Sequence, residues 1–163
     1  MQFCGKPFPG RNSRTFQLST RFQSQSHTQT QFPENFMEKL IMDFKELIAY
    51  KKAFDLANAG FGLSNQFPKE EMYSLADQIR RSSRSVCANI AESYRKRLYV
   101  KHFVSKLTDA DAENSETVVW LDFALSCKYI SNESHQELVR ETNEIGRLIN
   151  YMISNSGKFG CNE

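Results

Sequence analysis

Polar side chains that could take part in acid–base or nucleophilic chemistry gather on one face of a helical stretch, QIRRSSRSVCANIAESYRK at residues 78–96. At about 100° per residue, these side chains fall within a sector of about 80°. They are Gln78, Arg81, Ser85, Asn89, Glu92 and Lys96. The hydroxyl, amide and carboxylate in this set lack the general base and the oxyanion donors that a catalytic site needs. We therefore expect no catalytic residue and no enzymatic activity.

An apolar stripe lies directly beside this polar sector, and it consists of Leu75, Ile79, Val86 and Ile90. A helix that places amide and carboxylate groups against its apolar seam gives up stability, and in some systems it gains conformational specificity. We predict that the polar edge is buried where helices or subunits meet. We also predict that it forms a structural network with Glu116 of the next helix, which would fix the alignment of the helices.

Residue types that bind metal ions are present, but their spacing does not indicate a site. The chain has three histidines, which are His27, His102 and His135. Carboxylates of the third and fourth predicted helices could approach one another, namely Glu113, Glu116, Glu137 and Glu141. Metal sites in helical bundles pair such carboxylates with Glu-x-x-His motifs, and no such motif is suitably placed here. We expect no metal ion and no cofactor.

Basic residues are concentrated in the middle of the chain. Residues 78–106 hold eight Lys and Arg residues against Glu92 alone, whereas residues 107–163 hold ten acidic and four basic residues. The candidate nucleic-acid-binding residues are Arg80, Arg81, Arg84, Arg95, Lys96, Arg97 and Lys101. Contacts with phosphate groups would give salt-dependent binding that does not depend on sequence.

A charge run of this kind is more often a solvated helix face. In that interpretation the arginines form ion pairs with acids of the third predicted helix, which are Asp109, Glu113 and Glu116. The folded part from Asp43 onward is nearly neutral, which weakens the case for nucleic acid. Both interpretations remain open: a surface that binds RNA or a ribonucleoprotein, and a structural or protein-binding adaptor without nucleic-acid contact.

Composition places the chain among soluble globular proteins. It has 163 residues, of which 40% are hydrophobic and 25% are charged, and its net charge is +2. No apolar run approaches the ~18 residues of a membrane span, so we expect no membrane partner. The four cysteines are far apart and form no CxxC pair. This pattern indicates reduced thiols and a cytoplasmic location.

The N-terminal stretch differs in composition from the rest of the chain. Residues 1–36 are rich in Gln, Ser, Thr, Arg and Phe and show no sustained period, so we predict that residues 1–42 are a disordered or mis-annotated extension. A transit peptide and a basic nucleic-acid-binding arm are alternatives. A start of the natural protein at Met37 or Met42 is the favoured explanation, because helical patterning begins directly afterwards.

Four amphipathic helices are predicted between residues 43 and 157. Asp43 and Glu46 form a capping-box-like start for the first helix, at about residues 44–65. Its predicted apolar stripe is Leu47, Tyr50, Phe54, Ala57 and Phe61. The second helix is expected to begin at Glu70 and Glu71 and to end at residues 95–98. Its predicted stripe includes Met72 in addition to the four apolar residues named above.

The third and fourth helices have the most regular patterns. The third predicted stripe is Phe103, Leu107, Ala110, Asn114, Thr117, Leu121 and Ala124. Ser131 is the predicted cap of the fourth helix, whose stripe is Leu138, Thr142, Ile145, Ile149 and Met152. Gly146 could permit a close helix crossing, or it could be a tolerated glycine on the surface. Short connections make sequential helices antiparallel neighbours, so we predict an all-α, up-down-up-down four-helix bundle over residues 43–157, with residues 158–163 as a tail.

These residues resemble the four-helix-bundle proteins encoded in 23S rRNA intervening sequences, over about residues 43–155. The main matching motif is QIRRSSRSVCANIAES, with Gln78, Arg80, Arg81, Ser85, Asn89, Ile90, Ala91 and Glu92 at family positions. Further matches are DFKELIAYKKAFDLA at residues 43–57, the turn at residues 67–70, and Leu107, Ala110 and Glu116. The chain departs from the family pattern at Ser83, Cys87, Ser93, Ala112 and Glu113.

The resemblance implies a small bacterial cytoplasmic protein that assembles into rings, typically of five subunits. Biochemical activity is not established for the family, and association with rRNA is implied by gene location. The family is distantly similar to the accessory variability determinant of diversity-generating retroelements, which binds RNA through a basic ring surface. We therefore expect a homopentamer that binds RNA or a ribonucleoprotein through the basic surface of its second helix.

Overall fold

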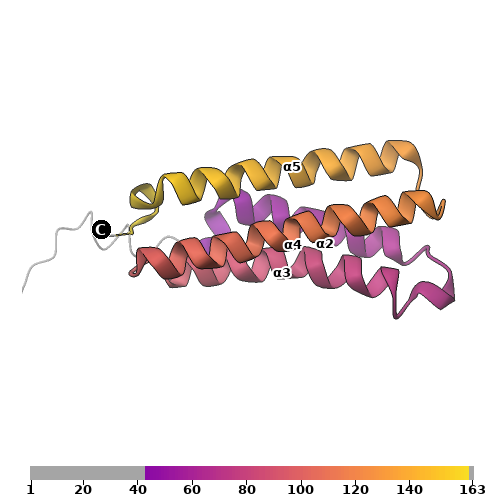
Figure 1. Cartoon of the computed structure of the whole chain (residues 1–163), viewed down its shortest axis with the longest axis horizontal. Coiled ribbons are helices and arrows are strands. Elements are labelled where there is room, and N and C mark those ends of the chain that lie inside the picture. Colours follow the sequence, from indigo (N-terminus) through magenta and orange to yellow (C-terminus); the bar gives the residue numbers. More distant parts are fainter. Residues whose placement is uncertain (1–42, 162–163) are drawn as a thin grey trace, which may run out of the picture. The chain divides into compact units, whose positions relative to one another are not determined.

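Four long α-helices joined by short turns make up residues 43–161, the part of the chain that the computed structural model describes (Figure 1). The helices are α2 (Ile48–Ser64), α3 (Leu75–Arg95), α4 (Val100–Ser126) and α5 (Asn132–Ser154). The 3-10 turns are η1 (Phe44–Glu46), η2 (Lys69–Glu71) and η3 (Ser156–Phe159). These residues contain no β-strand, so the prediction of an all-α four-helix fold is confirmed. The extension predicted at residues 1–42 lies outside the described part.

Contacts between the helices show that sequential helices run in opposite directions. Arg81 and Asn89 of α3 bond to Glu116 and Lys106 of α4, so the residue numbers rise on one helix as they fall on the other. The pairs between α4 and α5 follow the same rule, because Asn114 bonds to Thr142 and Asp122 bonds to His135. Helix α2 packs against α3 and α5, which closes the bundle.

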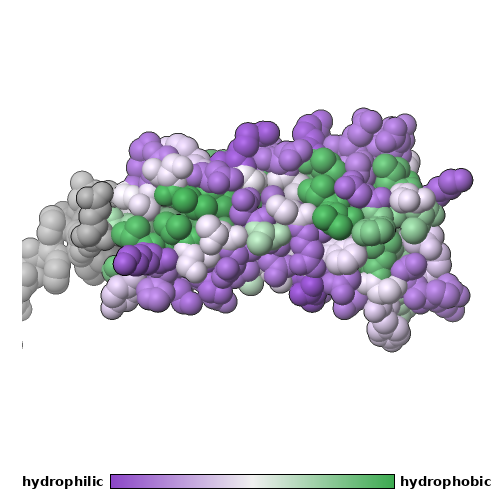
Figure 2. Space-filling view, viewed as in Figure 1, coloured by the Kyte–Doolittle hydropathy of each residue, from purple (hydrophilic) through white to green (hydrophobic). Residues whose placement is uncertain are grey.

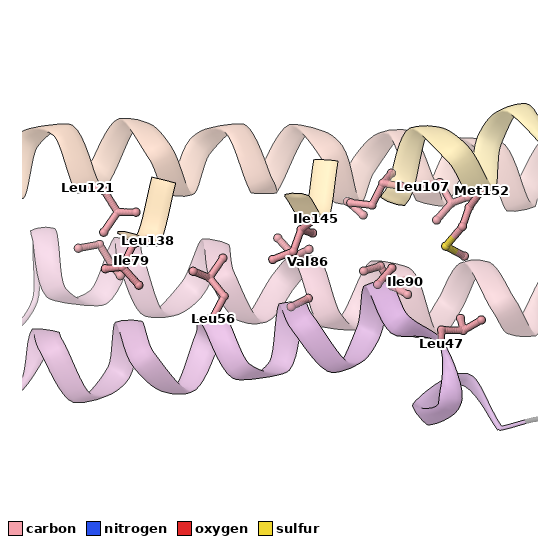
Figure 3. Packing of buried hydrophobic residues seen from close by; sticks show 14 of the residues in the cluster. Leu47, Leu56, Ile79, Val86, Ile90, Leu107, Leu121, Leu138, Ile145 and Met152 are labelled. Atoms are coloured by element: carbon pink, nitrogen blue, oxygen red, sulfur yellow. The ribbon is translucent and has the colours of Figure 1, made fainter. Parts of the chain in front are cut away.

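The apolar stripes of α4 and α5 are confirmed residue by residue. Each of the seven residues expected on α4 and the five expected on α5 is buried. On α3, Leu75, Ile79, Val86 and Ile90 are buried as well. These side chains meet along the bundle axis (Figure 3), while the face in Figure 2 is mostly hydrophilic. Between residues 43 and 161, no helix combines the length and apolarity that crossing a bilayer requires.

The predicted stripe of α2 is partly wrong. Phe54 and Phe61 are about half exposed, and the buried residues of the helix are Ala49, Ala53, Leu56, Ala57, Gly60 and Ser64. All of these residues except Leu56 are small, which lets α2 approach α3 closely: a Cβ atom at Gly60 would lie 3.2 Å from Cγ2 of Ile79. Phenyl rings on this side would hold the helices apart. The rings therefore lie on the flank of α2.

The starts of the helices also differ from the prediction in two places. Asp43 accepts a bond from the Lys45 amide and caps the turn η1, whereas α2 itself begins at Ile48. The acids predicted to open the second helix form η2, and α3 begins only at Leu75. Met72, predicted in the stripe, is therefore exposed in the connecting turn. By contrast, the cap at Ser131 is confirmed, because its hydroxyl accepts the Ser134 amide.

A buried asparagine links α4 to the backbone of α5. Nδ2 of Asn114 donates to the Thr142 carbonyl oxygen at 3.0 Å, and a Cβ atom at Gly146 would lie 3.3 Å from that nitrogen. Glycine at this position therefore leaves room for the amide to reach the backbone. This geometry supports the expectation that Gly146 permits a close crossing of the two helices.

The loop after α4 contains a residue whose backbone conformation is unfavourable for its type. Lys128 has φ 61°, and the amides of Lys128 and Tyr129 donate back to Leu125 and Ala124 at 2.9 Å each. This is a Schellman arrangement, in which the left-handed residue is most often glycine. The lysine Cβ atom therefore costs stability here.

We expect Lys128→Gly to raise the free energy of unfolding by about 0.5–1 kcal/mol, since it removes this strain and outweighs the entropy of the more flexible unfolded chain. Urea unfolding followed by circular dichroism measures the change. Lys128→Ala is the matched control, because it removes the same charge and keeps the Cβ atom. Equal effects of the two substitutions would show that the left-handed backbone is not the cause.

Candidate nucleic-acid interface

The polar edge of α3 forms two separate clusters with α4. In the first, Arg81 donates to Gln78 Oε1 at 3.2 and 2.9 Å and to Glu116 Oε1 at 2.7 Å. Trp120 Nε1 donates to the same glutamate oxygen at 3.0 Å. The expected link from Gln78 and Arg81 to Glu116 is therefore present in the structure.

The second cluster is centred on Lys106 of α4. Its Nζ lies 3.3 Å from Asn89 Oδ1, 3.2 Å from Glu92 and 3.3 Å from Asp109. Hydrogen bonds to Glu92 and Asp109 raise the pKa of the Lys106 ammonium group. Lys96 lies 3.8 Å from Glu92 at the edge of the cluster. Ser85 lies between the two clusters along α3.

Burial of this polar edge is less than expected in the single chain. The side chains of Glu92 and Arg81 are 50% and 53% exposed. Long charged side chains keep their ends in water while their stems lie along the helices, so the edge follows the α3–α4 boundary at the surface. Apart from Arg97, the buried polar residues are short ones that bond mainly to helix carbonyl groups or to each other: Ser64, Ser82, Ser83, Ser93, Asn114, Thr117 and Thr142.

Apart from Arg97, the predicted basic set divides into three groups in the structure. Arg81 and Lys96 belong to the ion-paired clusters. Lys101 is exposed at the start of α4. The third group consists of Arg80, Arg84 and Arg95, for which no carboxylate lies within ion-pair distance among residues 43–161. These three arginines carry charge that the described part of the bundle does not neutralise.

The prediction that Arg97 lies on the basic surface is wrong. Its side chain is buried, with Cζ 4.1 Å from the centre of the Tyr94 ring and Nη1 donating to the Tyr94 carbonyl at 2.7 Å. The C-terminal turn covers it, since a Cβ atom at Gly160 would lie 3.6 Å from its Nε. Cys161 is buried beside it, so residues 158–161 pack against the bundle instead of extending away as a tail.

The unpaired arginines lie over phenyl rings. Arg80 and Arg84 lie 5.0 and 5.5 Å from the centre of the Phe61 ring, and Arg95 lies 5.7 Å from that of Phe44. Arg80 is further held by bonds to Ser64 and Asn65 at 2.7 and 2.9 Å. We call this surface the arginine–phenylalanine face, and it consists of Phe44, Phe54, Phe61, Arg80, Arg84 and Arg95. Stacking of this kind holds a guanidinium group while leaving N–H donors at its edge.

A groove of about 340 Å³ runs along this face between α2 and α3. Aromatic rings form one wall: Tyr50 and Phe54 stack with centroids 6.2 Å apart, and Phe44 meets Tyr50 edge-on at 5.0 Å. Arg84 and Cys87 contribute from α3. Burial raises the pKa of the Cys87 thiol to about 11, so this thiol stays protonated and has little nucleophilic character near neutral pH.

The phenylalanines of this face were missed by the sequence reasoning, which placed Phe54 and Phe61 in the core. A second stripe of small residues on α2, from Ala49 to Ser64, is the signal that could have identified them as exposed. The chemistry of the face is cationic and aromatic, which suits phosphate groups and planar rings. Within the described residues, no three His, Cys, Asp or Glu side chains come close enough to hold a metal ion.

Comparisons with known proteins agree with the fold and with the arrangement of these helices. A crystal structure of a protein of unknown function from the S23 ribosomal protein family of Bacteroides thetaiotaomicron is similar, with a TM-score of 0.61 and 27% identity. The match covers 66% of this chain and 96% of that one. None of the curated protein sequences that were compared matches the chain.

The family model of the 23S rRNA-intervening sequence proteins matches residues 45–151, which include all of α2, α3 and α4 and nearly all of α5. The distant similarity to accessory variability determinants does not follow from these matches and stays a prediction. The matched region covers most of the described bundle, including the polar edge and nearly all of the arginine–phenylalanine face. The chain therefore belongs to the 23S rRNA-intervening sequence protein family.

Proposed function

We propose that this chain is a non-enzymatic, homo-oligomeric protein of the bacterial cytoplasm that binds RNA, alone or in a ribonucleoprotein, through its arginine–phenylalanine face. The observation that carries the proposal is that Arg80, Arg84 and Arg95 have no carboxylate partner within residues 43–161 and are held over phenyl rings. Each such cation can displace counterions from a phosphate backbone. Assembly into a ring of five subunits, as the resemblance implies, would multiply these contacts.

We expect the double substitution Arg84→Glu/Arg95→Glu to weaken binding to a structured RNA strongly. Loss of two phosphate contacts should reduce the slope of log K against log salt concentration by about 1.4 to 1.8. Fluorescence anisotropy with a labelled rRNA hairpin, at two or more salt concentrations, measures both quantities. Arg140→Glu/Arg147→Glu on α5 is the matched control, because it changes the net charge equally on another side of the bundle.

A protein-binding adaptor is the alternative, and exposed apolar side chains on α4 favour it. Val119 and Phe123 are both about half exposed, and hydrophobic residues gather in two groups on the face in Figure 2. Absence of RNA binding near physiological salt would favour the adaptor over the RNA-binding protein. An equal loss of RNA affinity in the double variants of α3 and α5 would favour it as well. Native mass spectrometry tests the oligomeric state separately, and a monomer would contradict the ring.

A further inference from the structure

The groove between α2 and α3 has the features of a binding site for an unpaired nucleobase. We propose that the partner RNA is single-stranded where it crosses the arginine–phenylalanine face, and that one of its bases stacks in this groove. The inference rests on the proposed function and specifies which form of RNA the site takes. Phe54 is the central element, because this residue is 50% exposed and lines the groove.

Exposed rings on the groove wall offer stacking surfaces to a planar ligand. Tyr50 and Phe54 both line the groove, with an angle of 21° between their ring planes, and Phe54 is the more exposed of the two. A base in an RNA duplex is already stacked on both faces and paired at its edge. Only an unpaired base can therefore place a face against this wall, and the Asn58 side chain at the groove provides an amide for its edge.

The arginines are placed so that phosphates could lie on either side of such a base. Arg84 and Arg95 are separated by eleven residues of α3, which corresponds to about 16 Å along the helix axis. Arg84 lies over Phe61 and lines the groove, and Arg95 lies over Phe44, another groove residue. A backbone that runs along α3 would thus meet a cation before and after the groove. This combination of a cationic track with aromatic platforms is typical of proteins that bind single strands.

The test compares a single-stranded 12-nucleotide RNA that contains one 2-aminopurine with the duplex formed by the same strand. With the full-length protein, we expect the single strand to bind more tightly and its 2-aminopurine fluorescence to be quenched by stacking. Phe54→Ala should weaken binding of the single strand about tenfold. Phe123→Ala is the matched control, because this phenylalanine of α4 is 54% exposed and lines a different groove.

A second variant tests the groove without removing a ring. Ala88→Leu places a larger side chain in the groove from α3 and should weaken binding and restore 2-aminopurine fluorescence to a similar extent. Equal affinity for single strand and duplex, with no effect of Phe54→Ala or Ala88→Leu, would overturn the base site and leave the phosphate-binding function intact. If these variants change the oligomeric state but not the RNA affinity, the groove holds a second copy of the chain and the inference is wrong. If no RNA binds, the proposed function itself fails.

Discussion

Arg97→Glu should lower the free energy of unfolding by about 3–5 kcal/mol, whereas Arg95→Glu should change it by no more than about 0.5 kcal/mol. Arg97 is only 7% exposed, and its guanidinium group lies 4.1 Å from the centre of the Tyr94 ring. A glutamate here would lose the bond to the Tyr94 carbonyl oxygen and would face that oxygen with a negative charge. It would also be covered by the turn at Gly160.

Arg95 provides the matched control because it lies two residues away and has the same charge. It is exposed at the end of α3 and contacts the Phe44 ring at 5.7 Å. Urea unfolding of both variants measures the difference in stability, and anisotropy with RNA measures binding. We expect stability to be lost at position 97 and RNA affinity to be lost at position 95. Equal and small changes in stability would show that Arg97 does not support the fold.

The contrast between these two arginines shows where sequence reasoning reached its limit. Neighbouring positions at the end of a helix differ in exposure according to which element covers them. Arg97 is covered by the C-terminal turn, which is far away in sequence, and no local pattern predicts that contact. The ion pair of Arg81 with Glu116 on another helix was, by contrast, expected from the sequence. Charge along the sequence indicated the basic region, but only tertiary contacts identified the arginines without ion pairs.

The fold was predictable where one face of a helix is clearly apolar. On α5 the polar and apolar residues segregate, so the buried stripe from Leu138 to Met152 followed directly from the sequence. On α2 apolar residues occur all around the helix, and both the aromatic and the small stripe fit a helical period. Close packing decided between them, because α3 approaches α2 too closely for rings. The position of Gly60 against Ile79 is the clearest sign of this approach.

Gly60→Leu should lower the free energy of unfolding by about 1–3 kcal/mol or more, because overpacking forces side chains and backbone to shift. A Cβ atom at this position would already lie 3.2 Å from Cγ2 of Ile79, and Ile79 is completely buried. Gly62→Leu is the matched control on the same helix, since no atom lies within 4 Å of its Cβ position. It should stabilise the protein by about 0.5 kcal/mol, because leucine is a better helix former than glycine.

Thermal and urea unfolding of the two variants measure this difference, and a third variant tests its cause. In an Ile79→Ala background the crowding side chain is absent, so adding Gly60→Leu should cost much less than it does in the natural sequence. A coupling energy of about 1 kcal/mol or more between the two positions would indicate direct contact. If the changes in the free energy of unfolding for Gly60→Leu and Ile79→Ala were additive, or if Gly60→Leu and Gly62→Leu changed it equally, α2 would not pack against α3 through its small residues. In that case the aromatic side of α2 would be the buried one, so Phe54 and Phe61 would belong to the core and not to the arginine–phenylalanine face.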